Sequence, residues 1–174
     1  MKYLVKFFVV TFFVLICTDT FAEQKIVVLD MKFVLNNSKA GKGAQDYLKK
    51  TLAQKQKKFQ EMEKSLKKEE SDLLAKKTII EKEEYQKKTD ALRKKVIDYQ
   101  SQRRASLDKI AVQRTEARQK LLEKIDPILN NYIKENGIIM VLDKKNILGG
   151  NVELDITNII IEKLNKELPS LNLK

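Results

Sequence analysis

The sequence contains no histidine, no tryptophan and only one cysteine, and the missing histidine and scarce cysteine each limit the possible chemistry. Without imidazole the chain lacks the commonest general base and the commonest zinc ligand, which excludes Ser-His hydrolysis and most transition-metal chemistry. The single cysteine, Cys17, lies in a segment that we expect to be removed, so the rest of the chain must fold without disulfides. We therefore expect no enzyme activity, no catalytic residue, no metal site and no cofactor.

Glycine and proline are also scarce, with five glycines and two prolines, and neither occurs between Ala44 and Asp126. A run of this length without helix breakers is predicted to be helical almost throughout. Charged residues make up 34% of the chain, which is high for a compact globule of 174 residues. The protein is therefore expected to be elongated or oligomeric.

The charge is strongly one-sided, because 35 lysines and arginines stand against 24 acidic residues, a formal net charge of +11. Such a balance favours an acidic partner, and the candidates are nucleic acid, an anionic lipid surface or an acidic protein client.

Residues 1–22 have the pattern of a secretory signal peptide. Lys2 and Lys6 precede the apolar run Phe7–Ile16, and Ala22 offers a small residue at the cleavage position. The competing interpretation is a membrane anchor, but the apolar run is about half of the roughly 20 residues needed to span a bilayer. Cleavage after Ala22 would leave an exported, strongly basic chain.

The two ends of the remaining chain predict a small α+β body. Lys25–Asp30 is a β-branched run typical of a strand, and "GIIMVLDKKNILGG" predicts two further strands. The segment "NVELDITNIIIEKLNKELP" predicts an amphipathic helix that begins at Asp155 or Thr157 as its N-cap and covers the sheet.

The middle of the chain predicts two helical arms. From about Lys39, apolar residues recur every seven positions, and a second apolar seam follows farther along the chain. The first seam contains Leu48, Leu52, Phe59, Met62, Leu66 and Leu73, and the second contains Tyr85, Leu92, Val96, Tyr99, Leu107, Ile110, Ala117, Leu121, Ile125 and Ile128.

The arms are predicted to form a hairpin that turns within Ala75–Ile80. Thr78 and Glu81 have the spacing of a capping box that would start the second helix, which Asp126-Pro127 would restart and Asn136-Gly137 would end. The alternative, one continuous helix, stays open because no glycine or proline marks the turn. It would be about 150 Å long and would separate the strands, which are marginal alone.

These elements predict an α+β fold in which a small β-sheet body formed from both chain ends carries a long antiparallel helical hairpin. The expected organisation is a signal peptide at 1–22, a body from 23–37 and 137–174, and a hairpin arm at 38–136 with its turn near 75–80. A small body with unpaired strand edges favours oligomerisation.

Two stretches of the sequence resemble the Skp/OmpH family of periplasmic chaperones: "KIVVLDMKFVLNNSKAGKGAQDYLKK", with its Ser-x-Ala-Gly-Lys helix start, and "GIIMVLDKKNILGGNVELDITNIIIEKLN", with its Asp-Ile-Thr helix. The resemblance implies a periplasmic homotrimer whose helical hairpins enclose a cavity like tentacles. It implies that the protein holds unfolded outer-membrane proteins in this cavity without ATP. The alternatives are a passive envelope scaffold and a basic nucleic-acid-binding coiled coil. The nucleic-acid alternative is disfavoured, because the chain is expected to be exported and contains no module that reads bases.

Exposed apolar and basic side chains of the arms are the candidate client contacts. For each apolar residue the competing interpretation is packing within the hairpin, and for each lysine it is a solvated helix face. The sequence Ala40-Gly41-Lys42-Gly43 lacks the leading Gly and the Lys-Ser/Thr ending of a phosphate loop. The apolar candidates are Phe59, Met62, Leu66, Leu73, Leu74, Ile79, Ile80, Tyr85, Leu92 and Tyr99, and the basic candidates are Lys67, Lys68, Lys76, Lys77, Lys87, Lys88, Lys94 and Lys95.

Overall fold

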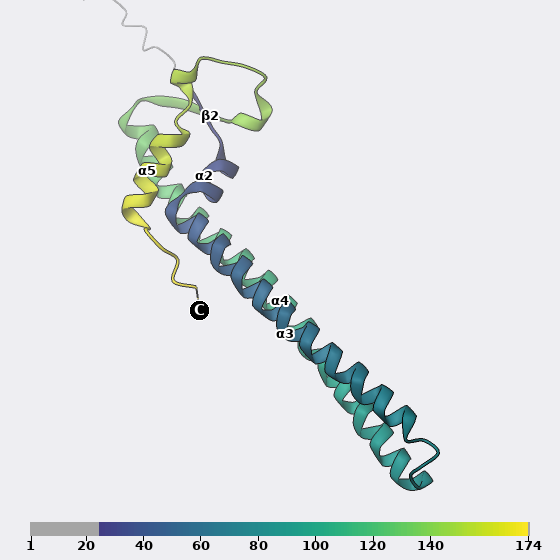
Figure 1. Cartoon of the computed structure of the whole chain (residues 1–174). Helices are drawn as coiled ribbons and strands as arrows, with labels where there is room; N and C mark the ends of the chain where they lie inside the picture. Colours follow the sequence, from purple (N-terminus) through teal and green to yellow (C-terminus); the bar gives the residue numbers. More distant parts are fainter. Residues whose placement is uncertain (1–24, 174) are drawn as a thin grey trace, which may run out of the picture.

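The computed structural model describes residues 25–173, and the signal peptide expected at 1–22 lies outside the described residues. Figure 1 shows a small body from which a long helical hairpin projects. The elements in chain order are β1 (Lys25–Leu29), α2 (Met31–Asn37), α3 (Lys39–Ala75), α4 (Lys82–Glu135), β2 (Ile138–Asp143), the 3-10 turns η1 (Lys144–Asn146) and η2 (Val152–Leu154), and α5 (Thr157–Glu167).

The hairpin consists of α3 and the larger part of α4, which lie side by side along their length (Figure 1). At about 1.5 Å of rise per residue, the 37 residues of α3 and the 54 residues of α4 are about 55 Å and 80 Å long. The chain reverses between them, where the amides of Ile79 and Ile80 both donate to the carbonyl of Lys76. The extra length of α4 runs into the body.

The body is held together by a parallel pair of strands from opposite ends of the chain. Strand β1 pairs with β2 so that Val27 lies beside Val141 and Leu29 beside Asp143. The whole hairpin is therefore the crossover connection that parallel strands require. Because the two strands lie in one sheet, the first and last parts of the described chain share a base.

A single apolar core fills the body. Ile125, Ile160, Leu164, Val27 and Val34 are almost completely buried, and they come from α4, α5, β1 and α2. Burial of these side chains fixes α5 and α2 against the end of α4, which roots the hairpin in the body. The core also contains Leu29, Leu35, Ala40, Leu121, Ile128, Ile138 and Ile156.

The prediction of a third strand within "KKNILGG" is wrong. Lys144–Asn146 forms a 3-10 turn and the chain then runs as an irregular loop in which Leu148 is fully exposed. Within residues 25–173 the sheet consists of β1 and β2, and Val28 of β1 makes an isolated bridge with Asp155.

Three predicted helix boundaries are also wrong. The N-cap of α4 is Glu81 rather than Thr78, and Glu81 makes no side-chain capping hydrogen bond. Pro127 does not restart the second arm but lies inside α4, because Ile125 and Ile128 on either side of it are buried in the core. Helix α5 has Ile156 as its N-cap. Asp155 accepts from the amide of Thr157 and pairs with Lys144, and the hydroxyl of Thr157 accepts from the amide of Asp30.

Candidate functional site

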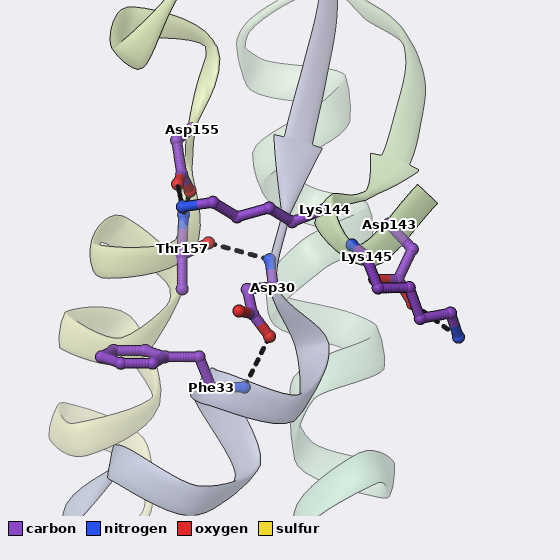
Figure 2. Close-up of polar contacts among 7 residues, drawn as sticks. All are labelled: Asp30, Phe33, Asp143, Lys144, Lys145, Asp155 and Thr157. Atoms are coloured by element: carbon purple, nitrogen blue, oxygen red, sulfur yellow. Dashed lines mark hydrogen bonds and ion pairs between the residues drawn. The ribbon is translucent and has the colours of Figure 1, made fainter. Parts of the chain in front are cut away.

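Polar contacts at the carboxyl ends of β1 and β2 fix the base of the hairpin (Figure 2). Oδ1 of Asp30 caps α2 by accepting from the amide of Phe33 at 2.7 Å, and the amide of Asp30 donates to Oγ1 of Thr157 at 2.9 Å. Asp143, which ends β2, accepts from the amide and the side chain of Lys145. Asp30, directly after β1, and Asp143, the last residue of β2, thus each cap the element that follows the strand.

An ion pair joins the η1 turn to the segment before α5. Nζ of Lys144 lies 2.6 Å from Oδ2 of Asp155, and Oδ1 of Asp155 accepts from the amide of Thr157 at 2.9 Å (Figure 2). Partial burial raises the pKa of the Asp155 carboxyl, but the hydrogen bonds from Lys144 and Thr157 outweigh it, so this pKa lies below its usual value. The hydrogen bond to Asp155 raises the pKa of Lys144.

The start of α3 is attached to α5 by a second set of contacts. Ser38 is completely buried, and its hydroxyl accepts from the amide of Gly41 as the N-cap of α3. The amide of Lys39 donates to Oδ1 of Asn165 at 2.6 Å. These bonds set the direction in which the hairpin leaves the body.

Along the arms, three of the predicted contact residues lie in the seam between α3 and α4. Phe59, Leu73 and Leu92 are each at most 9% exposed. The ring of Phe59 packs edge-on against Tyr99, with centroids 6.0 Å apart. In one hairpin these side chains therefore pack against the opposite helix. The remaining candidates outside the tip are half-buried: Met62, Leu66, Tyr85 and Tyr99 on the helices, and Ile80 in the turn.

At the tip of the hairpin, the apolar candidates are open to solvent. Leu74 is 58% exposed and Ile79 is 78% exposed. Lys76 and Lys77 lie between them in the chain and are exposed too. The tip therefore combines accessible aliphatic side chains with positive charge.

The predicted basic residues fall into two groups. Lys67, Lys87 and Lys88 pair with a glutamate four positions earlier on their own helix, and Lys95 of α4 pairs across the hairpin with Glu69 of α3. The hydrogen bond from Lys67 lowers the pKa of Glu63, and that from Lys88 lowers the pKa of Glu84. Within residues 25–173, Lys68, Lys76, Lys77 and Lys94 have no carboxylate within 4.0 Å, and the charge of Lys76 contributes to the lowered pKa of Glu84 from farther away.

Sequence reasoning missed the apolar side chains that α4 exposes along its length. Ile97 is 58% exposed, Val112 is 55% exposed, and Leu107, which was assigned to the seam, is 43% exposed. Half-buried Ser106 and Gln113 occupy the seam positions instead. Steps of four and three residues along α4 lead from Tyr99 through 103 and 106 to Ile110 and then to 113. The signal was an apolar residue next to a seam position: Ile97 and Leu107 lie one position after one, and Val112 lies one position before Gln113.

A shallow groove crosses the hairpin where the seam contains these small and polar residues. It is lined by Tyr47, Thr51, Lys55, Ser106, Lys109 and Ile110. In the described part of the chain no group of three or more acidic residues has the geometry of a metal site, and no helix is long and apolar enough to cross a membrane.

Comparison with known proteins identifies this architecture. The family "Outer membrane protein (OmpH-like)" matches residues 25–164, which is most of the chain. The chain belongs to the OmpH-like family. A Skp-like protein of Pseudomonas aeruginosa is 24% identical over 166 residues, covering 95% of this chain and 99% of that protein.

Among solved structures, an OmpH-like chain from Caulobacter crescentus has the same fold. It superposes with a TM-score of 0.80 at 18% identity, covering 88% of this chain and 90% of that one. Membership of the OmpH-like family supports a periplasmic chaperone role.

Proposed function

We propose that the protein is an ATP-independent holdase chaperone of the periplasm that binds unfolded outer-membrane proteins and prevents their aggregation. One observation carries the proposal: the hairpin presents exposed aliphatic side chains such as Leu74 and Ile79 beside lysines without carboxylate partners, far from the body. A surface of this kind binds chains that are both apolar and acidic.

The physical mechanism is weak capture at many points. Strands of outer-membrane barrels alternate apolar and polar residues, so the unfolded chain exposes its apolar set in water. The positive field of the arms attracts an acidic chain over about 10 Å at ordinary salt. Each apolar contact then adds a small term, and several contacts on one client give a high combined affinity.

The candidate residues differ in how they would reach a client. Leu74 and Ile79 are accessible as they stand, whereas Phe59, Leu73 and Leu92 contact a client only if α3 and α4 separate. A client could reach only the exposed part of the half-buried side chains, which are Met62, Leu66, Ile80, Tyr85 and Tyr99. The positive field of the arms includes the unpaired lysines Lys68, Lys76, Lys77 and Lys94. Lys67, Lys87, Lys88 and Lys95 add less to it, because each is paired with a glutamate.

Three copies with their arms around a shared cavity form the proposed working assembly. In a single chain the small sheet leaves Ile139, Met140 and Leu142 of β2 and Ile26 of β1 exposed. A sheet of two strands with an uncovered apolar face is unstable in isolation, so association through the bodies would bury it. The body would then comprise 23–37 and 137–174, and the arms 38–136.

Dilution of a urea-unfolded outer-membrane porin into buffer with the protein lacking residues 1–22 tests the function. Light scattering should stay low with the protein present and rise without it, and added salt should weaken this protection. Aggregation at the same rate in both cases would contradict the chaperone role and favour a passive scaffold. Light scattering of the protein alone should give three times the mass of one chain.

A further inference from the structure

The five arginines of the chain are confined to one part of α4. Arg93, Arg103, Arg104, Arg114 and Arg118 all fall within residues 93–118, and every other basic residue is a lysine. Helix α3 contains no arginine. The two cations are therefore segregated along the hairpin.

Four of the arginines lie in one straight row along α4. Residues four and three positions apart lie above one another on a helix, and the row follows this spacing without a break. It lies one position round the helix from the seam row that contains Leu92, Tyr99 and Ile110. The arginine row, as we name it, consists of Arg93, Ile97, Gln100, Arg104, Leu107, Ala111, Arg114 and Arg118.

The arginine row contains no acidic residue, and all its members are exposed. The row on the other side of the seam is different: it carries Lys95, Asp98, Lys109 and Glu116, and Lys95 is paired with Glu69. One flank of α4 is therefore arginine and aliphatic, and the other is a mixture of lysine and carboxylate.

Most guanidinium groups of the row have no partner. Arg93 lies 3.6 Å from Asp90 in an exposed pair, whereas Arg104, Arg114 and Arg118 have no carboxylate within 4.0 Å anywhere in residues 25–173. Arg103, which occupies a seam position, lies near Glu63, a carboxylate already bonded to Lys67. The row thus presents three free planar forks of hydrogen-bond donors.

We propose that the arginine row is the docking strip for clients and that it selects unfolded segments in which aspartate or glutamate lies close to apolar side chains. This proposal rests on the proposed function and specifies which segments of a client the arms recognise. A guanidinium binds a carboxylate through two parallel hydrogen bonds, which a lysine ammonium cannot do. Between the arginines, Ile97, Leu107 and Ala111 would contact the apolar side chains that lie next to the carboxylate in the client.

The length of the row favours an extended polypeptide over a compact anionic head group. The 25 steps from Arg93 to Arg118 cover about 38 Å of helix at 1.5 Å per residue. Arg114 and Arg118 are about 6 Å apart along the axis, close to the distance of about 6.6 Å between side chains on one face of an extended chain.

Charge-preserving and charge-removing variants separate the arginine fork from the general field. The triple variant Arg104→Lys, Arg114→Lys, Arg118→Lys keeps the net charge but loses the forks. Arg104→Gln, Arg114→Gln, Arg118→Gln loses three charges as well. The matched control is Lys49→Gln, Lys57→Gln, Lys64→Gln, which removes three exposed charges from α3.

Binding is measured by fluorescence anisotropy with a labelled unfolded peptide that mixes aspartate and glutamate with apolar residues, and with its Asn/Gln counterpart. We expect the lysine triple to weaken binding of the acidic peptide about threefold and the glutamine triple about tenfold or more. The α3 control should change it less than twofold. The amide counterpart should bind all four proteins equally weakly.

The proposal is overturned if the lysine triple binds like the unaltered protein, or if the α3 control loses as much as the glutamine triple. A lipid site would be favoured instead by two results together. The unaltered protein would bind the acidic and the amide peptide equally well, and anionic phospholipid vesicles would displace the peptide from the unaltered protein but not from the glutamine triple. Failure of the unaltered protein to bind any unfolded chain would instead contradict the proposed function. Melting curves of all variants should coincide, because the altered side chains are exposed.

Discussion

The amide of Asp30 donates a 2.9 Å hydrogen bond to the hydroxyl of Thr157, so two residues 127 positions apart meet at the base of the hairpin. Asp30 directly follows β1 as the N-cap of α2, Thr157 begins α5, and Thr157 is only 5% exposed. The bond therefore ties the first described strand to the last helix. The direction of the arms depends on this junction, because α2 and α3 follow directly from Asp30.

Replacement of Thr157 by valine should destabilise the body. Valine has the shape of threonine but cannot accept, so the partly buried amide of Asp30 is left without a partner at a cost of about 1 to 3 kcal/mol. Urea unfolding at one fixed protein concentration measures the change. Thr157→Ser keeps the hydroxyl and is the control, and equal losses in both variants would show that the methyl group rather than the hydrogen bond matters.

The Lys144–Asp155 pair predicts a stability that falls in acid. The pKa of Asp155 is lower in the folded than in the unfolded chain, so its contribution is complete above the usual aspartate pKa of about 3.9 and is lost as pH falls through the folded value. The pKa of Lys144 is raised, so its contribution is complete below about 10.4 and is lost only as the pH rises through its folded value. Between these limits the pair should contribute a constant amount.

Unfolding of the unaltered protein and of Asp155→Asn at pH 7, 4 and 3 measures this dependence. The two free energies of unfolding should differ at pH 7 and converge as the pH falls. Asp46→Asn, which alters an exposed residue of α3, provides the control and should follow the unaltered protein at every pH. A constant difference between Asp155→Asn and the unaltered protein would contradict the assignment.

The long-range arrangement of the chain followed from the sequence, whereas several local boundaries did not. The absence of glycine and proline from 44 to 126 indicated helices, and the need of the terminal strands for a partner indicated a reversal between them. Thr78 and Glu81 failed as a capping box because residues 76–80 form a turn and α4 begins at Lys82. A short motif gave the region of the turn but not the residue at which the helix starts.

Tertiary burial explains the failure at Pro127. Proline removes the amide that would bond to the carbonyl of Glu123, which is normally enough to end or kink a helix. Here Ile125 is completely buried and Ile128 is 4% exposed, so interruption of the helix would cost both contacts. Glu123 is exposed, and its carbonyl can bond to water instead.

The candidate surface was harder to predict than the fold, because a heptad pattern indicates which residues are apolar but not which positions the partner helix covers. Phe59 and Leu74 are both apolar residues of the first arm, yet one is 8% and the other 58% exposed. Leu107 was assigned to the seam, but the true seam position is Ser106, a residue too small and polar to be recognised.

Phe59 and Ile79 should therefore respond differently to substitution. Phe59→Ala removes a buried ring that packs on Tyr99 and should lower the free energy of unfolding by about 3 kcal/mol. Ile79→Ser alters a side chain that is 78% exposed and should change it by less than about 0.5 kcal/mol. Urea unfolding gives both values, and the porin dilution assay should show weaker protection for Ile79→Ser at unchanged stability. Equal protection by Ile79→Ser and the unaltered protein would remove the tip from the client-binding surface.

The two glycines at the start of α3 should respond in opposite ways to replacement by alanine. A Cβ on Gly41 would overlap the carbonyl oxygen of Leu35 and would lie 2.9 Å from Oγ of Ser38, whereas a Cβ on Gly43 has no atom within 4 Å. Both residues lie in the same helix and gain the same methyl group. Gly41→Ala must displace the backbone between α2 and α3, so we expect it to destabilise the protein by at least about 1 to 3 kcal/mol.

Gly43→Ala should instead stabilise the protein by up to about 1 kcal/mol, because alanine has the higher helix propensity and nothing opposes its side chain. Thermal and urea unfolding of the two variants should therefore change in opposite directions. A shift of the same sign in both would show that the close approach of Leu35 to Gly41 does not hold α2 against α3. Because Gly41 follows the buried Ser38 N-cap, its strain should also loosen the base of the hairpin, seen as faster amide exchange at Lys39 and Gly41.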